Sequence, residues 1–432
     1  MTDSGRPLAG VRVVALEQYM SAPYCSLLLA DAGAEVIKIE RPGLGDPRRS
    51  IPPFVEKDGV RMGVGFMAYN RNKKSLALNL KSDEGRDLYR ALVAKSDIVV
   101  ENLRPGSVDR MGLGYEALSE VNPGLIYAAV SGFGRLPGRE GPYGDWPSFD
   151  VVAEAMGGVM HMIGFADKPP SPSIYGMPDL YAGMAAAHGV TMALYRRTVT
   201  GRGQFVDSAM YDGVLSLNER MVSLAANTGA RPRRGDPPGF YPRGPMPVSD
   251  GYVAFTIPDD IMWRRFCRML GRPDLLDDPR LTSPDLRTEH RALLDEVARP
   301  VFAELTRDEA VRRLQEVGVP AGPVQTSEDL LECPQLEARG VRVTVDYEGL
   351  GELQFVRTPL LTSDAPDVPV NPAPTLGRDT RQILAEILEL SAAEVSRLAA
   401  EAVIGTDQGQ TATGSGAVRS DGAASSGSLR RA

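Results

Sequence analysis

One aspartate is a candidate for chemistry because of the residues around it. Residues 175–184 have the sequence YGMPDLYAGM, in which Asp179 follows Pro178 and begins a helical run of small residues. Sequence physics favours a capping role, in which the Asp179 side chain binds the first N–H groups of the helix. The alternative is a nucleophile: the positive helix end keeps a partly desolvated carboxylate ionised, and Ala182 and Gly183 leave room for a bulky ligand.

A second candidate is a set of cations that come after, or near the ends of, predicted strands. Ligands of open α/β sheets bind at the carboxyl ends of the strands. Several cations converging there suit a ligand with several phosphate groups, whereas a solvated surface is the alternative without function. The set consists of Lys38, Arg41, Lys81, Arg104 and Arg110.

The loop after the first predicted strand lacks the glycine motif of dinucleotide-binding folds. Nicotinamide dinucleotides require G-x-G-x-x-G between the first strand and helix, so that the backbone can approach the pyrophosphate. The corresponding loop, residues 17–23, has the sequence EQYMSAP and contains no glycine. NAD is therefore not expected as a cofactor.

Composition excludes further classes of protein. The 432 residues include 48 Lys+Arg and 56 Asp+Glu, a net charge of −8, which argues against a nucleic-acid binder. The three cysteines and three histidines are far apart, so neither a disulfide framework nor a zinc site is expected. No apolar run reaches the roughly 20 residues that span a bilayer, and the N-terminus lacks a signal peptide's apolar core. We expect a cytoplasmic protein with no membrane partner.

The elements that position these residues follow an α/β pattern. Residues 11–16 (VRVVAL) and 35–40 (EVIKIE) are predicted strands, and the helical pattern PYCSLLLADAGA lies between them. The pattern continues with a helix over 82–96 and strands at 97–102 and 124–130. Parallel strands joined by helices predict a doubly wound α/β layer.

The rest of the chain divides into several regions. We expect residues 1–227 to form the N-terminal part of a large domain and 228–250, rich in Pro, Gly and Arg, a linker or lid rather than packed structure. A small α/β domain is expected over 251–345, and a return linker with the C-terminal part of the large domain over 346–404. Residues 405–432 have almost no large apolar side chains and are predicted to be a disordered tail.

Several motifs in order resemble the class III CoA-transferase family, also called the CaiB/BaiF family, over roughly residues 7–404. They are PLAGVRVVALEQYMSAPYCSLLLADAGAEVIKIERPGLGD, NRNKKSLALNLKS, VENLRPGSVDRMGLGYEAL, VSGFG, TGRGQFVDSAM and VGVPAGPV. The resemblance implies a large Rossmann-like domain built from both chain ends, a small α/β domain, and two ring-shaped chains interlocked as a homodimer.

Residue by residue, the resemblance assigns the family's catalytic aspartate to Asp179. It implies that coenzyme A is a substrate, that a carboxylic acid is the other, and that no metal or further cofactor is needed. The family's CoA contacts match Met20, Ser21, Arg41, Leu78, Asn79, Leu80, Lys81, Asn102, Leu103, Arg104 and Arg110. This set overlaps the cations at the strand ends, which makes 3′-phospho-ADP their expected ligand.

Residues that differ from particular branches of the family reduce the number of reactions expected for this chain. Met20 stands where the formyl-CoA:oxalate branch often has glutamine, and residues 239–247 (GFYPRGPMP) replace that branch's glycine run, so oxalate is not the expected substrate. Asp150 lies in PSFD, without the racemase branch's histidine. We expect a CoA-transferase; the alternatives are a 2-methylacyl-CoA racemase or epimerase and a non-catalytic CoA-binding protein.

Overall fold

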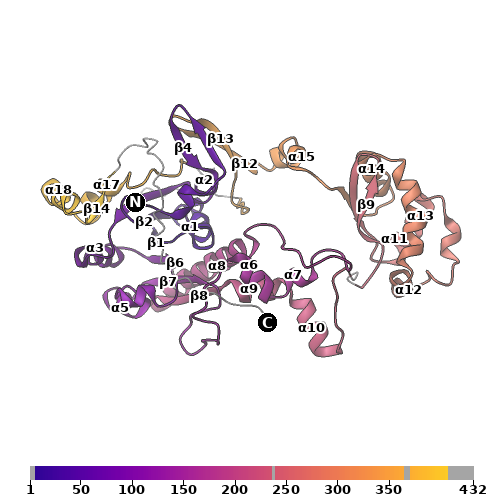
Figure 1. The fold of residues 1–432 in the computed structure, drawn as a ribbon, viewed down its shortest axis with the longest axis horizontal. Helices are drawn as coiled ribbons and strands as arrows, with labels where there is room; N and C mark the ends of the chain where they lie inside the picture. Colours follow the sequence, from indigo (N-terminus) through magenta and orange to yellow (C-terminus); the bar gives the residue numbers. More distant parts are fainter. Residues whose placement is uncertain (1–4, 236–238, 364–369, 407–432) are drawn as a thin grey trace, which may run out of the picture. The chain divides into compact units, whose positions relative to one another are not determined.

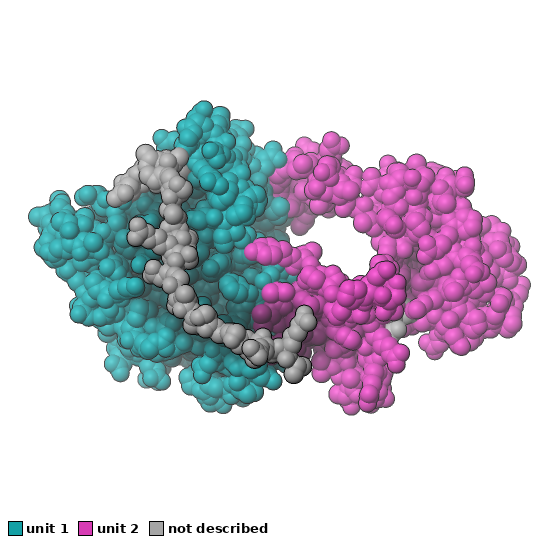
Figure 2. Space-filling model, in the orientation of Figure 1, with its two compact units in different colours: residues 1–150, 176–213, 343–432 teal, residues 151–175, 214–342 magenta. Residues whose placement is uncertain are grey.

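The computed structural model describes residues 5–235, 239–363 and 370–406 (Figure 1). Its contacts divide the chain into two compact units, coloured in Figure 2. Unit 1 comprises Met1–Asp150, Gly176–Gly213 and Val343–Ala432, and unit 2 comprises Val151–Tyr175 and Val214–Arg342. Unit 1 therefore draws on both chain ends. Residues 151–175 and 214–227, which the sequence placed in the large domain, belong to unit 2.

A seven-stranded sheet forms the centre of unit 1, with the strand order β14-β5-β2-β1-β6-β7-β8. All neighbouring strands are parallel except β14, which is antiparallel to β5. The chain builds outward from β1 on one side through β2 and β5, and on the other through β6, β7 and β8. The strands are β1 (Arg12–Leu16), β2 (Glu35–Glu40), β5 (Lys73–Leu78), β6 (Ile98–Glu101), β7 (Ile126–Ser131), β8 (Gln204–Ala209) and β14 (Ile404–Gly405).

The reversal of strand order beside β1 is a topological switch point, where open α/β sheets form a crevice. Strands β1, β6 and β7 are almost continuously apolar and buried, as expected for a parallel sheet with both faces covered, whereas the buried β2 also carries Lys38 and Glu40. Strand β5 was not predicted from its sequence pattern, whereas β1, β2, β6 and β7 lie within two residues of their predicted bounds.

Helices cover the sheet and complete its core. They include α1 (Ser21–Asp31), α3 (Asp83–Ala94), α4 (Ser107–Arg110), α5 (Tyr115–Val121), α8 (Met177–Thr200), α17 (Thr380–Glu386) and α18 (Ala392–Ala400). Helices α17 and α18 come from the C-terminal part of the chain and contribute Ile383, Leu384 and Leu398 to the core that contains β1, β2 and β5. A capping box of Ser391 and Glu394 begins α18. The two chain ends thus share one hydrophobic core.

Two hairpins pack beside the sheet of unit 1, and neither was predicted. Strands β3 (Phe54–Lys57) and β4 (Val60–Gly63) form one, and β12 (Arg342–Tyr347) and β13 (Gly351–Val356) form the other. Met62, Phe66, Val345, Tyr347 and Phe355 join them in a separate core cluster that also includes α2 (Val64–Asn70). The short 3-10 helix η1 (Pro47–Ser50) precedes the first hairpin.

Unit 2 contains a three-stranded antiparallel sheet of β9 (Arg243–Val248), β10 (Gly251–Thr256) and β11 (Ala321–Pro323). Strand β9 lies inside the segment expected to be an unpacked linker, and its Met246 is buried in the core of unit 2. The two prolines of β9 are accommodated because β9 is an edge strand, where a missing N–H costs no ladder hydrogen bond.

Helices α11 (Asp260–Met269), α13 (Arg291–Ala303) and α14 (Arg307–Glu316), with the 3-10 helix η2 (Pro273–Leu276), share a hydrophobic core with this sheet. The further helices of unit 2 are α7 (Val159–Met162), α10 (Glu219–Thr228), α12 (Pro284–Glu289), α15 (Ser327–Leu331) and α16 (Pro334–Ala338), while α6 (Asp150–Met156) and α9 (Met210–Leu217) begin in unit 1 and end in unit 2. Among the described residues, no helix has the length and apolarity needed to cross a bilayer. The predicted tail lies outside the described residues from position 407 onward.

Candidate active site

Helix α8 begins at a glycine, three residues before the candidate aspartate. Gly176 is the N-cap, with φ of 80°, and no side chain caps this helix end. A Cβ on Gly176 would lie 2.3 Å from Cε of Met20, so this position requires glycine for space as well as for its backbone conformation. Asp179 lies within the first turn rather than at the cap. The capping role that the sequence favoured is therefore wrong.

Helices α1 and α8 approach each other closely at another glycine. A Cβ on Gly183 would lie 2.4 Å from the carbonyl oxygen of Ser21, so only glycine allows this contact. Ala182 is fully buried, and its carbonyl oxygen accepts a hydrogen bond of 2.8 Å from Ser208. The expectation that Ala182 and Gly183 leave room for a ligand is wrong, because helix and strand fill that space. Their small size instead brings the start of α1 beside Asp179.

Three groups surround the Asp179 carboxyl. The Ser21 hydroxyl donates a hydrogen bond to it, while the Asp150 carboxylate repels its negative form and the Arg48 guanidinium attracts it. Burial, reinforced by Asp150, outweighs Ser21 and Arg48 and raises the pKa of Asp179 to about 7. Asp150 also accepts a hydrogen bond of 2.9 Å from the Gly176 N–H, which ties it to the start of α8. The result is a carboxyl that changes charge near neutral pH.

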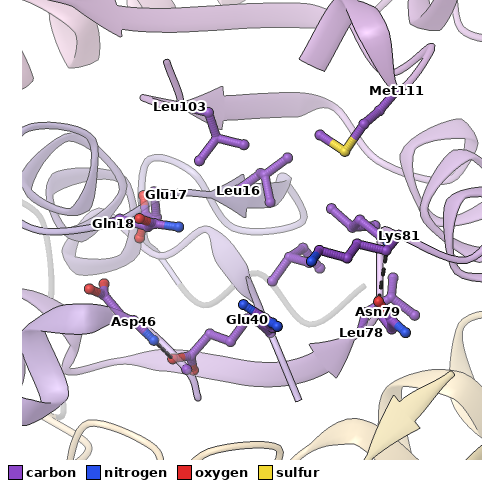
Figure 3. A pocket seen from close by; sticks show the side chains of 14 residues that line it. Leu16, Glu17, Gln18, Glu40, Asp46, Leu78, Asn79, Lys81, Leu103 and Met111 are labelled. Carbon is purple, nitrogen blue, oxygen red and sulfur yellow. Dashed lines mark hydrogen bonds between the residues drawn. The ribbon is translucent and has the colours of Figure 1, made fainter. Parts of the chain in front are cut away.

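A pocket lies at the carboxyl ends of β1, β2, β5 and β6 (Figure 3). The close-up shows Lys81 from the segment after β5 and Leu103 from the segment after β6 pointing toward the same space, while the Glu40 carboxylate turns to the Asp46 N–H. Six of the residues predicted to contact CoA line it, namely Arg41, Leu78, Asn79, Leu80, Lys81 and Leu103. The switch point therefore brings together residues from four strands.

The remaining predicted contacts lie around this pocket. The Asn102 side-chain amide accepts from the Gln18 N–H at 2.9 Å and donates to the Gln18 carbonyl oxygen at 2.8 Å and to the Ser21 hydroxyl at 3.1 Å. Because Gln18 lines the pocket and Ser21 contacts Asp179, Asn102 joins the two places. Met20 is buried, whereas Arg104 and Arg110 are exposed and do not line the pocket.

A buried ion cluster of Glu17, Lys38, Glu40, Asp46 and Lys73 lies beneath the pocket. Lys38 Nζ is 2.9 Å from an Asp46 carboxylate oxygen and 3.5 Å from one of Glu17, and Lys73 Nζ is 2.7 Å from Glu17. Burial alone would raise the pKa of Glu17, but Lys73 and Lys38 outweigh it and lower that pKa. Lys38 was predicted to face a ligand. That prediction is wrong, because the Lys38 side chain is inaccessible and its charge is neutralised internally.

The other predicted cations differ from Lys38 in being exposed. Arg41, Lys81 and Arg104 form no ion pair with any acidic side chain within residues 5–235, 239–363 and 370–406, and Arg110 contacts only the Ser107 hydroxyl at 3.3 Å. Their charges are available to a ligand from outside. Across the same ranges, no group of three or more His, Cys, Asp or Glu side chains could hold a metal ion.

Comparison with known proteins identifies the family. The family model described as "CoA-transferase family III" matches residues 8–380. The chain belongs to CoA-transferase family III. The succinyl-CoA–D-citramalate CoA-transferase of Chloroflexus aurantiacus is 37% identical over 402 residues, covering 92% of this chain and 98% of that protein. The succinyl-CoA:mesaconate CoA-transferase of Haloarcula marismortui is 38% identical over 386 residues, covering 88% and 96%.

The fold of the family III CoA-transferase agrees with that membership. A crystal structure of a CaiB/BaiF family protein from Brucella suis aligns with a TM-score of 0.78 at 33% identity and covers 88% of this chain and 99% of that one. The resemblance found from the motifs is confirmed. The protein is an enzyme, a CoA-transferase, and CoA is carried by its substrates.

Sequence reasoning missed two groups beside Asp179. Arg48 was not singled out, because η1 has no periodic pattern that predicts the burial of an arginine. Asp150 was noted for the missing histidine before it and as the next candidate nucleophile after Asp179, but not as a neighbour that raises the pKa of Asp179. The sequence D-P-R-R at residues 46–49 does predict a capped turn, but not the direction of the Arg48 side chain.

Proposed function

We propose that this CoA-transferase moves CoA from an acyl-CoA donor to a carboxylic acid through covalent intermediates on Asp179. The observation that carries the proposal is the Asp179 carboxyl itself. It is largely buried, it has no ion pair like that of Glu17 within the described residues, and its pKa, raised to about 7, leaves only part of it ionised at neutral pH. A carboxyl kept so costly to ionise suits a reacting group better than a structural one.

The reaction proceeds by two exchanges of acyl groups. An Asp179 carboxylate oxygen attacks the thioester carbonyl of the donor, and collapse of the tetrahedral intermediate expels CoA thiolate and leaves a mixed anhydride. The thiolate then attacks the aspartyl carbonyl of the anhydride, which releases the donor acid and gives an aspartyl-CoA thioester. The acceptor carboxylate attacks that thioester, and the same steps in reverse deliver the new acyl-CoA and restore Asp179.

The neighbours of Asp179 have roles in this sequence. Ser21 and Arg48 favour the ionised form that begins the attack, and Asp150 opposes it. A carboxylate that is destabilised in the resting enzyme is a stronger nucleophile than a solvated one, since less favourable solvation has to be given up on attack. The balance of these groups sets how much of the enzyme is ready to react at a given pH.

The CoA-binding site that we propose is the pocket together with the exposed cations. Its volume of about 170 Å³ is below the roughly 300–1,000 Å³ of sites that enclose a whole drug-sized ligand. It therefore suits one end of CoA, with Leu78 and Leu103 against the base. Arg41, Lys81, Arg104 and Arg110 would bind phosphate oxygens, which charge-assisted hydrogen bonds hold strongly.

For substrates, we propose a succinyl-CoA donor and a dicarboxylic acid acceptor. The support is similarity: the two relatives above use succinyl-CoA by name, and citramalate and mesaconate are both dicarboxylic acids. We also propose that the chain works as a homodimer with the interlocked arrangement that the family implies. Sedimentation equilibrium would test the dimer, and a single species at the monomer mass would contradict it.

One experiment tests the covalent mechanism directly. Purified enzyme is mixed with succinyl-CoA alone and quenched with hydroxylamine, which converts an activated aspartyl group into a hydroxamate. Peptide mass spectrometry should then find the hydroxamate on the peptide that contains Asp179, and transfer to mesaconate should be measurable in the same preparation. Transfer without any labelled carboxyl would contradict the mechanism, and binding of CoA without transfer would indicate a non-catalytic protein.

A further inference from the structure

Asp46 is a buried carboxylate with partners in two different segments. It is only 2% exposed, and its Oδ1 accepts a hydrogen bond of 2.9 Å from the Arg48 N–H and one of 3.2 Å from the Tyr19 N–H. Its other oxygen is 2.9 Å from Lys38 Nζ, a charge contact that holds the carboxylate in place. Its own N–H donates to Glu40 at 3.0 Å. One oxygen atom of Asp46 therefore joins the loop after β1 to the 3-10 helix η1.

The loop after β1 needs such a support because of its backbone. Tyr19 has φ of 63°, in the left-handed region that residues with a side chain rarely adopt. The Asp46 bond holds its N–H, and the Tyr19 ring packs edge-on against Phe149, with 5.5 Å between centroids. Met20 and Ser21 follow at once and begin α1. The turn at Tyr19 thus determines where the Ser21 hydroxyl lies.

The second segment held by Asp46 carries Arg48. Asp46 is the N-cap of η1, so its bond to the Arg48 N–H fixes the first turn of that helix. The Arg48 side chain fills a space that exists because residue 65 is glycine: a Cβ there would lie 2.4 Å from Nε of Arg48. This packing keeps the guanidinium inside the protein, where it attracts the Asp179 carboxylate.

We propose that Asp46 is a positioning residue for CoA transfer, which sets Ser21 and Arg48 against Asp179 through a single carboxylate oxygen. The inference rests on the proposed role of Asp179. The charged and hydrogen-bonding groups acting on the Asp179 carboxyl are Ser21, Arg48 and Asp150. Through the Tyr19 and Arg48 N–H groups, Asp46 supports Ser21 and Arg48, the two of these groups that stabilise the carboxylate.

The test uses Asp46→Ala and Asp46→Asn in the full chain and follows the pH dependence of kcat/KM, which reports groups of the free enzyme. Without the Asp46 oxygen, Ser21 and Arg48 move away and the carboxylate of Asp179 loses its support. The acidic limb of the profile should then move to higher pH by about one unit, and kcat should fall about 100-fold in Asp46→Ala, the size expected of a misplaced catalytic group.

Asp46→Asn should still fold, because asparagine is also a good N-cap and retains an oxygen acceptor. Its amide group cannot pair with Lys38, so the limb should move in the same direction by less, with kcat reduced about tenfold. The matched control is Asp31→Asn, which alters another buried pair of unit 1: Asp31 is 3.3 Å from Arg71 and lies at the far end of α1. It should leave the limb in place.

An unshifted limb in folded Asp46→Asn, or an equal shift in Asp31→Asn, would overturn the inference; folding is checked by circular dichroism and thermal midpoint. If Asp46→Ala does not fold, Asp46→Asn alone decides. Hydroxamate trapping on the wild type separates the two proposals. A labelled Asp179 with an unshifted limb refutes only the role of Asp46, whereas an unlabelled Asp179 refutes the mechanism on which that role rests.

Discussion

Two carboxyl groups of unit 1, the buried Glu17 and the partly buried Asp179, have opposite electrostatic surroundings. Glu17 lies in the buried ion cluster, 2.7 Å from Lys73 Nζ, and also accepts hydrogen bonds from Ser26, so its pKa is lowered in spite of burial. Asp179 lies near a second carboxylate, and its pKa is raised to about 7. Burial raises the pKa of a carboxyl in both places, and only the cluster supplies enough positive charge to reverse the effect.

This difference in pKa distinguishes the carboxylates that stabilise the fold from the one that we propose reacts. Glu40 resembles Glu17, because the positive charge of Arg49, 2.7 Å away, outweighs burial and lowers the pKa of Glu40 to about 2. Such carboxylates stay charged at every physiological pH and hold loops in place. Asp179 is kept near its titration point and at a cost in stability, which is characteristic of a reacting group.

The largest effect should come from Asp179→Asn. An amide cannot form the anhydride, so kcat should fall by at least about 10³-fold, measured as succinyl-CoA-dependent transfer. Stability should change in the opposite direction. The pKa of Asp179 is raised in the folded protein, so the charged form costs stability: nothing below about pH 4, and the full amount above about pH 7. Asparagine removes this cost.

Urea denaturation at two pH values checks the second half of that prediction. The rise from 3.8 to about 7 corresponds to a gain of up to about 4 kcal/mol in the unfolding free energy of Asp179→Asn at pH 8, and to none at pH 4. A variant that is inactive but less stable than wild type at pH 8 would mean that Asp179 stabilises the fold, and the contrast with Glu17 would be lost.

Glu17→Gln should have the opposite outcome, a large loss of stability. The change leaves Lys73 and Lys38 buried with less negative charge, and removing one partner of a buried pair typically costs about 3–5 kcal/mol. Urea denaturation at pH 7 measures it. The control is Glu389→Gln, which breaks an exposed contact of 3.0 Å with Lys95 and should cost less than about 1 kcal/mol. Equal losses in the two variants would contradict the distinction.

The sequence predicted most of the strands and helices that carry this site, but not which of its charged side chains are buried and paired. Strands β1, β2 and β6 at the pocket, the helix that carries Asp179 and the exposed arginines follow from periodicity and strand ends, whereas β5 does not. Lys38 could not be told from Arg41 in this way, because its counter-ions Glu17 and Asp46 reach it only in the folded chain. Asp150 precedes Asp179 by 29 positions, and no local pattern predicts that they come close.

Binding of CoA should depend on Arg41, an exposed cation, more than on distant surface charge. Arg41→Ala should weaken CoA binding by about 1–3 kcal/mol, roughly 5- to 150-fold in Kd, through loss of a charge-assisted phosphate contact. Calorimetric titration with CoA measures this. Arg61→Ala is the control, since Arg61 is exposed on β4 and pairs with Glu56 at 3.6 Å. Unchanged affinity for CoA in Arg41→Ala would contradict the proposal that the exposed cations bind CoA.

The smallest effect is expected from Asp150→Asn, which changes the electrostatics of Asp179 and little else. Asparagine retains an oxygen that can accept the Gly176 N–H, so the start of α8 should keep its geometry. Loss of the neighbouring negative charge lowers the pKa of Asp179 from about 7, and the acidic limb of kcat/KM should move down by about one pH unit. The variant should therefore outperform wild type, relative to its own maximum, at pH 5.5.

The companion variant Asp150→Ala separates charge from geometry. It removes the same charge and also the acceptor of the Gly176 N–H, so its limb should move as in Asp150→Asn while its maximal kcat falls further. A fall in kcat at every pH in Asp150→Asn, with the limb unmoved, would mean that Asp150 takes part in the chemistry itself. The two carboxyl groups would then act as a pair, and Asp179 could no longer be described as a single nucleophile tuned by its neighbours.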